Sequence, residues 1–504
     1  MHSLSLADAQ APMILAIDIG SSSVRTLLYD AQGYRVNGSE AQLEHRLLTT
    51  NDGGSFADAP HLFGLLCQAL DLTVDFARER HSDIGAVAAS CFWHGLLGLD
   101  ARGTPVTPVY MWGDKRSVDQ AAALRDDRKL AGMMLRETGC RAHSSYWPAK
   151  LEWLRETGNA DVSNVASWVS LTDYIAQELT GELSTSISMA SGTGLLNIDA
   201  NTWDATLLDR FGVRQEQLPP LMDRTQPLPA PKPEYQQRWP ALASIPWYPA
   251  IGDGAAANLG AGCVGDNRIA LTIGTSAAMR MILKGDENHP TWPQSLWIYR
   301  LDSSHRVVGG ALSNGGNAMT WLADQLAGGD IAAITEEAAQ IEPDSHGLTS
   351  LPFFAGERSP SWNDDAFASL IGLRLATTRA DIFRATLEGT AFRLAAIYDD
   401  LRTIAQPVHE IHANGGAALN SPLWMQIIAD TLNHRLDALD AEAEASARGV
   451  AVSALEALGA WKSLAPETST IARSFPANRD NAPIYQRARD RQQRYESAIN
   501  LVAD

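Results

Sequence analysis

The sequence predicts an α/β fold with mixed sheets, divided into two structurally related domains. Strand patterns alternate with helical patterns in both halves of the 504 residues. Residues 16–22 (Ala-Ile-Asp-Ile-Gly-Ser-Ser) align without gaps on residues 270–276 (Ala-Leu-Thr-Ile-Gly-Thr-Ser), and each copy lies at the head of its half. Prolines recur densely over 219–249. We therefore expect one domain at 1–248 and a second at 249–504.

The first half is expected to begin with a β-hairpin whose turn is made of small residues. The twelve residues before it look like a loose tail. Gly181 ends a helical pattern, as glycine does at many helix C-termini. The expected elements are strands at 14–17 and 24–29, a helix at 60–80, a buried strand at 84–90, and helices around 150–154 and at 171–179.

The second half contains the longest expected helix, at 378–405. Its start carries the capping box Thr378-x-x-Asp381, in which the two side chains satisfy free backbone N–H groups. Pro422 suits the first turn of another helix, because that turn does not need the N–H that proline lacks. The other expected elements are a strand at 410–413 and helices after 253, around 321–322, and at 423–432, 447–458 and 485–501.

Composition and charge exclude several classes of function. The net charge of −19 argues against a general affinity for nucleic acid or an anionic membrane. No apolar stretch approaches the roughly 20 residues of a membrane-spanning helix. The N-terminal residues show no basic segment followed by an apolar run, so we expect a cytoplasmic protein. The isolated cysteines Cys67, Cys91, Cys140 and Cys263 favour buried free thiols over disulfides or a zinc site.

Asp253 is the first candidate for a reactive side chain. It lies between Gly252 and Gly254, before a run of small helix-forming residues. Aspartate is a good N-cap and a helix N-terminus stabilises an anion, so Asp253 is expected to stay ionised and to accept a proton from a substrate hydroxyl. The flanking glycines would let a ligand approach the backbone. An aspartate that only begins a helix is the alternative.

The two aligned segments predict a phosphate-binding site between the domains. Each hairpin turn would offer backbone N–H groups and hydroxyls to a phosphate chain. Asp18, which precedes the turn Gly20-Ser21-Ser22-Ser23, could hold a hydrated Mg²⁺ against the phosphates. An aspartate that stabilises the turn is the alternative.

Two further motifs follow strands. Gly415-Gly416 could let adenine or ribose lie against bare backbone, although a tight strand-to-helix turn uses the same residues. Trp93-His94 follows the strand at 84–90, where ligands of α/β folds commonly bind. The pair could form a sugar-binding edge, and a partly buried structural histidine is the alternative. Most of the other tryptophans are expected in the core.

These motifs resemble those of the FGGY carbohydrate kinases over nearly the whole chain. Residues 18–25 resemble the first phosphate loop of the family, 252–256 the motif that carries the catalytic base, 273–276 the second phosphate loop, and 414–416 the adenosine loop. The most specific match runs over 368–388, as Ala-x-Leu-x-Gly-Leu, seven residues, and Asp-Ile-x-x-Ala-Thr-Leu-Glu.

The resemblance implies two actin-like ATPase (ribonuclease H-like) domains with the active site in a central cleft. It implies that Asp253 deprotonates a terminal sugar hydroxyl, which attacks the γ-phosphorus of ATP bound with Mg²⁺. Asp18 is the expected metal ligand, and Trp93, His94 and Asp253 the expected substrate-binding residues. The expected nucleotide-binding residues are Gly20, Ser21, Ser22, Ser23, Gly274, Thr275, Asn314, Gly315, Gly415, Gly416 and Asn420.

Several pieces, including residues 356–363, look closest to gluconokinase-like members, so gluconate is the first expected substrate. Lys115, Arg116 and Arg358 are candidates for binding its carboxylate. Trp93-His94-Gly95 replaces the Met-His pair common in sugar-specific members. A kinase for xylulose or another ketose or polyol is the alternative. An actin-like ATPase without a sugar substrate is a remote one. The expected partner is a small molecule, not nucleic acid or membrane, and a homodimer stays open.

Overall fold

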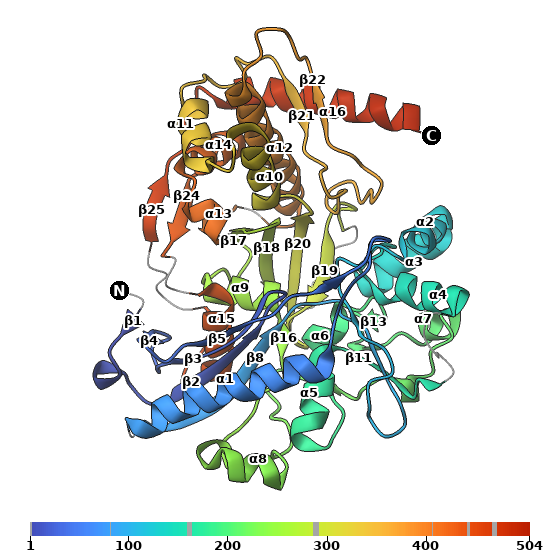
Figure 1. Cartoon of the computed structure of the whole chain (residues 1–504), viewed down its shortest axis with the longest axis vertical. Coiled ribbons are helices and arrows are strands. Elements are labelled where there is room, and N and C mark those ends of the chain that lie inside the picture. Colours follow the sequence, from blue (N-terminus) through green and yellow to red (C-terminus); the bar gives the residue numbers. More distant parts are fainter. Residues whose placement is uncertain are drawn as a thin grey trace.

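The computed structural model describes residues 3–80, 82–158, 164–285, 292–405, 407–440, 444–465 and 471–503. Two seven-stranded mixed sheets organise these residues, one in each half of the chain. Figure 1 shows the sheets one above the other, with helices α9 (Asp253–Gly260) and α15 (Ala445–Ala457) between them. The expected α/β class with mixed sheets is confirmed.

The first sheet is built around the expected hairpin. Strands β2 (Met13–Ile19) and β3 (Ser23–Tyr29) are antiparallel, and β2 pairs in parallel with β8 (Ile84–Cys91). Helix α1 (Ala59–Glu79) packs against β3 and is capped by Asp58. The strand order is β1 (Ser3–Leu4), β4 (Arg35–Val36), β3, β2, β8 and β16 (Ile251–Gly252), and β5 (Ala41–Glu44) pairs with β3. The pairing of β1 with β4 corrects the expectation of a loose N-terminal tail.

The second sheet repeats this arrangement. Strands β17 (Arg268–Ile273) and β18 (Ala277–Lys284) form an antiparallel hairpin, and β17 pairs in parallel with β23 (Glu410–Asn414), as β2 does with β8. The internal sequence match therefore reflects a repeated structural unit. The strand order is β19 (Trp297–Arg300), β20 (His305–Leu312), β18, β17, β23, β24 (Leu436–Leu439) and β25 (Ile471–Phe475).

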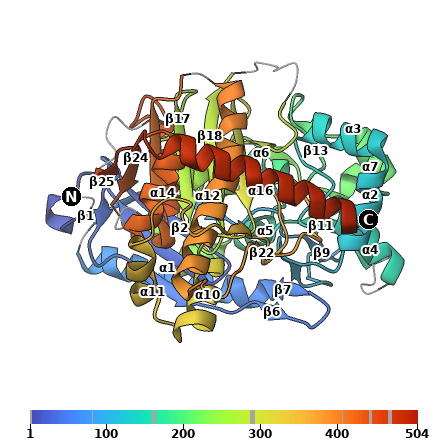
Figure 2. The ribbon, with the colours of Figure 1, turned by 90° about the horizontal axis from the view of Figure 1, so that it is seen from above.

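Helices cover the second sheet. The longest, α12 (Arg379–Ile404), begins with the expected capping box of Thr378 and Asp381. Figure 2 looks onto α16 (Ala482–Ala503), which lies across α12 and packs against α14 (Pro422–Leu432). The remaining elements of this half are α10 (Gly316–Ala327), α11 (Ile331–Ala339), α13 (Gly416–Leu419), β21 (Thr349–Leu351) and β22 (Ser369–Ile371).

The first half carries a further set of small elements, and part of this set shares an apolar core of its own built around buried tryptophans. Helix α5 (Leu171–Thr180) ends at Gly181 in the left-handed region, as expected. The other members of the set are β6 (Leu48–Thr49), β7 (Ser55–Ala57), β9 (Leu97–Leu99), β10 (Val109–Tyr110), α2 (Val118–Asp126), α3 (Arg128–Thr138), α4 (Trp147–Thr157), β11 (Ser167–Val169), β12 (Thr185–Ser186), α6 (Ile187–Ser191), β13 (Leu196–Asn197), β14 (Thr202–Trp203), α7 (Ala205–Arg210), β15 (Leu221–Met222) and α8 (Pro233–Arg238).

Helix α15 joins the two halves. It lies between β24 and β25 of the second sheet in the chain, yet it packs against β2, β8 and α9. The α9 and α15 backbones touch at two glycines: a Cβ on Gly260 would lie 1.9 Å from the Ala445 oxygen, and one on Gly449 1.7 Å from the Ala256 oxygen. Strand β16 also belongs to the first sheet although it follows residue 248, and the domain division at that residue stays a prediction.

The four cysteines are buried and free, as expected. Two large apolar cores pack around the two sheets. Within the described ranges, no helix has both the length and the apolar composition that crossing a bilayer requires.

We predict that Gly449→Ala lowers the free energy of unfolding by about 1–3 kcal/mol, because the new methyl group overlaps the Ala256 carbonyl and pushes α15 off α9. Gly64, in α1, is the matched control, since a Cβ added there would meet no atom within 4 Å. Gly64→Ala should leave stability unchanged or raise it by about 0.5–1 kcal/mol. Denaturant unfolding compares the two, and equal effects would contradict the tight crossing.

Candidate active site

Asp253 lies at the carboxyl edge of the first sheet. Strand β16 pairs in parallel with β8, and β8 with β2, so the three strands end at the same edge. This register brings Asp253 near Asp18, and their charges interact. The Ser90 hydroxyl, from β8, donates a hydrogen bond of 2.6 Å to Asp18 Oδ1. Two carboxylates therefore converge where ligands of α/β folds commonly bind.

The local backbone around Asp253 differs from the expectation. Gly252 occupies the N-cap position, Asp253 is the first residue of α9, and its Oδ1 accepts the Gly254 N–H at 2.7 Å. The flanking glycines make room for a protein side chain: a Cβ would lie 1.8 Å from the Trp93 indole at Gly252 and 2.7 Å from it at Gly254. The expected N-cap role of Asp253 and the ligand approach at these glycines are thus corrected.

The charge state of Asp253 is governed by burial. Desolvation raises its pKa, and the positive charge of Arg280, the Gly254 N–H and the charge of Arg358 oppose that rise. The net direction is upward, so the helix N-terminus does not hold the pKa down as expected. A carboxylate with a raised pKa is a stronger base than an ordinary aspartate.

A cavity of about 270 Å³ opens beside Asp253. Both halves of the chain line it, and many of its lining residues are aromatic. The lining includes Ser21, Phe92, Trp93, His94, Trp112, Ser145 and Tyr146 from the first half, and Arg280, Trp297, Tyr299, Arg358 and Trp362 from the second.

Trp93 and His94 both line this cavity, as the sequence suggested. The Trp93 indole N–H already donates to the Ser188 oxygen at 2.9 Å, so it offers an aromatic face and no free polar tip. His94 Nδ1 lies 2.5 Å from the Gly192 oxygen, and since a carbonyl only accepts, Nδ1 carries the hydrogen. Burial lowers the pKa of His94 to about 3, so the ring is neutral with Nε2 as its acceptor.

Two arginines bring positive charge to the cavity. The Arg358 guanidinium lies 5.1 Å above the Trp112 ring and donates to the Leu312 oxygen at 3.0 Å. Arg280, in β18, donates to Thr272 Oγ1 at 3.3 Å. Within the described residues, the buried Nε atom of each has no hydrogen-bond partner. Each guanidinium therefore keeps donor capacity for a ligand.

Of the three cations considered from sequence, Arg358 lines the cavity and the other two are paired elsewhere. Lys115 Nζ lies 2.6 Å from Asp364, and Arg116 Nη2 lies 2.6 Å from Asp114. Sequence reasoning missed Arg280. The sequence feature that could have identified Arg280 is its position as a charged residue in the middle of an apolar strand, directly after the second phosphate-loop motif.

The first hairpin turn adds hydroxyl groups near the carboxylates. Ser21 and Ser22 are exposed at the turn, and Ser21 lines the cavity. Ser23 is buried at the start of β3, and its carbonyl accepts the Gly20 N–H at 3.0 Å, which closes the turn. Of Gly20, Ser21, Ser22 and Ser23, only Ser21 lines this cavity or the second cavity described below.

A second cavity, of about 990 Å³, lies among α10, α11, α12 and α14. Gly274 and Thr275 line both cavities, so the two meet at the second hairpin turn. Gly416 and Asn420 also line the second one. Trp321, expected in the core, is 50% exposed and lines this cavity.

Besides Gly20, Ser22 and Ser23, three more residues expected to bind nucleotide line neither cavity: Asn314, Gly315 and Gly415. The Asn314 amide bonds the backbone of residues 355–356, with distances of 2.9 and 3.0 Å. Gly315 packs against the backbone of the β17–β18 turn. Gly415 has a φ of 95°, and a Cβ there would lie 2.4 Å from the Ile273 oxygen, so the turn itself requires glycine.

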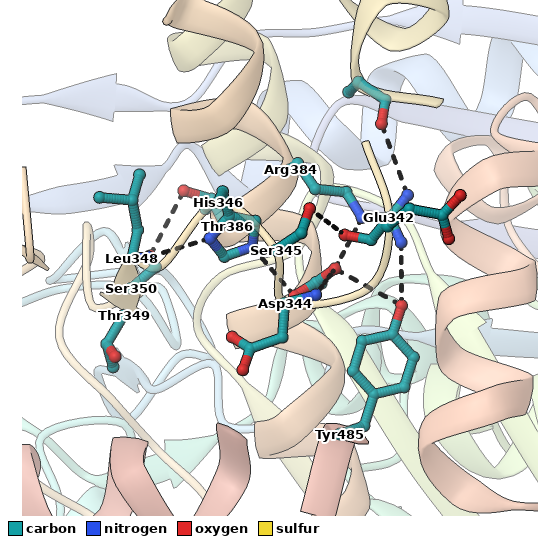
Figure 3. Close-up of polar contacts among 12 residues, drawn as sticks. Glu342, Asp344, Ser345, His346, Leu348, Thr349, Ser350, Arg384, Thr386 and Tyr485 are labelled. Carbon is teal, nitrogen blue, oxygen red and sulfur yellow. Dashed lines mark hydrogen bonds and ion pairs between the residues drawn. The ribbon is translucent and has the colours of Figure 1, made fainter. Parts of the chain in front are cut away.

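One cluster outside the cleft resembles a metal site. Asp344 and His346, both labelled in Figure 3, and Glu388 have possible ligand atoms within 4.8 Å of one another. His346 Nδ1 accepts a backbone N–H at 3.0 Å, so Nε2 carries the hydrogen that faces Glu388 at 3.1 Å. Arg384 binds Glu388 at 2.6 Å, and an arginine of α16 pairs with Asp344. With its carboxylates neutralised and its imidazole protonated at Nε2, the cluster fastens α12 to α16.

The repeated hairpin units, facing each other across a cleft with joined cavities, define the class of two-domain actin-like ATPase folds. The models of the FGGY family of carbohydrate kinases match this chain in both parts: the N-terminal domain over residues 13–260 and the C-terminal domain over 269–458. The chain belongs to this family and is a sugar kinase.

Relatives of the chain include kinases for different substrates. A gluconokinase of Bacillus subtilis is 28% identical over 461 residues, covering 88% of each chain. A xylulose kinase of Lactococcus lactis is 27% identical, covering 94% of each. The crystal structure of a gluconate kinase from Lactobacillus acidophilus has a TM-score of 0.89 at 26% identity, covering 97% of this chain and 98% of that one.

We predict that Gly274→Val raises the KM for ATP by about tenfold or more, by blocking backbone approach where the cavities meet. No atom lies within 4 Å of a Cβ on Gly274, so valine should not disturb the empty protein. Sugar affinity without nucleotide and the thermal midpoint should change little. Gly415→Ala should instead lower the midpoint, because alanine is strained at a φ of 95° and its Cβ would overlap the Ile273 oxygen. An unchanged ATP KM in folded Gly274→Val would contradict the prediction.

Proposed function

We propose that this kinase transfers the γ-phosphate of ATP to the terminal hydroxyl of a sugar acid, with gluconate as the first candidate. The observation that carries the proposal is the pair Arg280 and Arg358, which both line the cavity beside Asp253 and keep unpartnered Nε atoms. A substrate carboxylate pairs well with guanidinium groups, whereas a neutral ketose gains less from them. The gluconokinase relative and the gluconate kinase structure support the same substrate class.

In the proposed reaction, Asp253 accepts the proton of the substrate hydroxyl. Its raised pKa suits this task, and the adjacent Arg280 keeps the carboxylate ionised when the base is needed. Trp93 and His94 supply ring surface and one acceptor nitrogen to the sugar. The oxygen freed of its proton attacks the γ-phosphorus, and the bond to the β-phosphate oxygen breaks.

The proposed nucleotide site is the larger cavity. The base and ribose would lie among α10, α11 and α14, where Gly416, Asn420 and the exposed face of Trp321 line the wall. The phosphates would extend past Gly274 and Thr275 toward Asp253, since these two residues line both cavities. From the first half, the turn of Gly20 to Ser23 would approach the phosphate chain through Ser21, which lines the smaller cavity.

Asp18 is the proposed ligand of Mg²⁺. Burial raises its pKa, the Ser90 hydrogen bond opposes the rise, and the negative charge of Asp253 adds to it. A divalent cation would relieve both the desolvation and the repulsion. The nearby groups are oxygen donors, a carboxylate and exposed serine hydroxyls, which fit this ion. When bound, the cation would neutralise phosphate charge.

A xylulose, ketose or polyol kinase is the competing assignment, supported by the xylulose kinase relative and by the aromatic walls of the cavity. We further propose a cytoplasmic enzyme, consistent with four buried free thiols. Its domains would divide near residue 248.

We predict that Asp253→Asn lowers kcat roughly 10²–10⁴-fold, because an amide cannot accept the proton. The thermal midpoint should not fall, since Asp253 is not the N-cap and burial disfavours its charge. Nucleotide affinity should persist. In the wild type, kcat/KM should rise as the pH increases through the raised pKa of Asp253. This rise should be absent from the pH profile of the variant. A folded variant with more than about a tenth of wild-type activity would sink the assignment.

We predict that gluconate is the best acceptor in a panel of sugars, polyols and sugar acids followed by ATP consumption. Arg358→Met should lower kcat/KM for gluconate by about 100-fold and that for neutral sugars by less than about tenfold, because only the acid loses a charge-assisted contact. A general distortion of the cavity would lower kcat/KM for gluconate and for neutral sugars alike, so the ratio of the two decreases separates the charge effect from such damage. If xylulose or glycerol exceeds gluconate in wild-type kcat/KM by about tenfold or more, the assignment to gluconate is wrong.

A further inference from the structure

One loop of the second half reaches across the cleft to the first. Residues 356–364 carry Arg358 and Trp362, which line the smaller cavity, and end at Asp364. The loop is closed on itself: the Glu357 N–H donates to the Asn363 oxygen at 2.9 Å, and the Trp362 N–H donates to the Arg358 oxygen at 2.5 Å. Movement of Asp364 is therefore transmitted to Arg358.

Asp364 binds the opposite wall through four side chains. Its carboxylate lies 2.6 Å from Lys115 Nζ, 2.9 Å from His143 Nε2 and 3.5 Å from Arg125 Nη1, and it accepts the Ser144 hydroxyl at 3.4 Å. All four partners belong to the part matched by the N-terminal domain model, and Asp364 to the part matched by the C-terminal one. The Asp364 side chain is fully buried. This contact joins the two halves.

The electrostatics of the contact favour the ionised carboxylate. Burial alone would favour the neutral acid, but the imidazole of His143 and the ammonium of Lys115 hold the pKa of Asp364 far below its usual range. His143 Nδ1 accepts the Ser145 N–H at 3.1 Å, so its Nε2 carries the hydrogen that faces Asp364. The carboxylate is thus charged and surrounded by donors.

The contact and the cavity share the same two segments. On the first-half wall, Trp112 lines the cavity three residues before Lys115, and Ser145 and Tyr146 line it directly after the residues that bind Asp364. On the loop, Trp362 lines it two residues before Asp364. The backbone of Trp362 has a φ of 57°, a conformation that costs a non-glycine residue energy and persists where surrounding contacts enforce it.

We propose that Asp364 is a positioning residue of the sugar site: by binding the opposite wall, it holds Arg358 and Trp362 in the cavity. The inference rests on the proposed role of that cavity in sugar binding. The other end of the loop is fixed within the second half, where Arg393 binds Glu357 at 2.6 Å and Glu496 at 2.6 Å. Only the Asp364 end of the loop is thus held by contacts with the first half, so its position depends on how the two halves pack together.

The test compares Asp364→Asn with the wild type, using the best acceptor of the substrate panel. Asparagine keeps the shape and removes the charge. The acceptor KM should rise about tenfold, with the ATP KM unchanged and kcat lowered less than about threefold, because the loss falls on sugar positioning. Acceptor affinity without nucleotide, followed by tryptophan fluorescence, should weaken equally. Asp344→Asn is the matched control: it removes an ion pair of 2.5 Å within the second half and should leave the acceptor KM unchanged.

Lys115→Met tests the same contact from the other wall and should also raise the acceptor KM. In the double variant the two effects should not add, since both remove one interaction. If Asp364→Asn does not fold, Lys115→Met decides the question alone. A wild-type acceptor KM in the folded variants overturns the inference. If Arg358→Met then still raises that KM, the sugar site stands without the anchor; if it does not, the proposed site fails as well.

Discussion

The parallel pairing of β2, β8 and β16 is the constraint on which the site depends. It ends three strands at one edge and so places Asp18 and Asp253 side by side, although 235 positions separate them in the chain. The contact of Gly260 and Gly449 then lets α15, from the far end of the second half, pack onto the same strands. A larger residue at either glycine would separate the halves, and with them the two hairpins that face the cleft.

Burial and charge compete within that cleft. Desolvation raises the pKa of both carboxylates and lowers the pKa of Arg280 to about 10 and that of Arg358. At an effective dielectric constant of about 20, unit charges about 4 Å apart interact by about 4 kcal/mol, enough to keep such opposed groups ionised. The carboxylates and guanidinium groups of the cleft are therefore charged and only partly paired with one another. A ligand whose charges pair with these groups binds there in preference to one without such charges.

The sequence predicted what local patterns encode. The hairpins, the capping box at Thr378 and the repeat were evident, because alternation, caps and small-residue turns act over a few residues. It did not predict the roles of Gly252 and Gly254, which accommodate the Trp93 indole, since that contact joins residues about 160 positions apart. Arg280 was missed for the same reason: only the folded sheet aims it at Asp253. Asn314 and Gly415 lie in correctly recognised motifs, yet they shape the backbone and do not line the cavities.

A chain with a net charge of −19 that binds anionic ligands must supply positive charge locally. Four cations considered above differ in this respect. Lys115 and Arg116 are neutralised by Asp364 and Asp114, whereas Arg280 and Arg358 line the cavity and each has a buried Nε without a hydrogen-bond partner among the described residues. Phosphoryl transfer depends on positioning and charge neutralisation, so few reactive side chains are needed once these charges are in place.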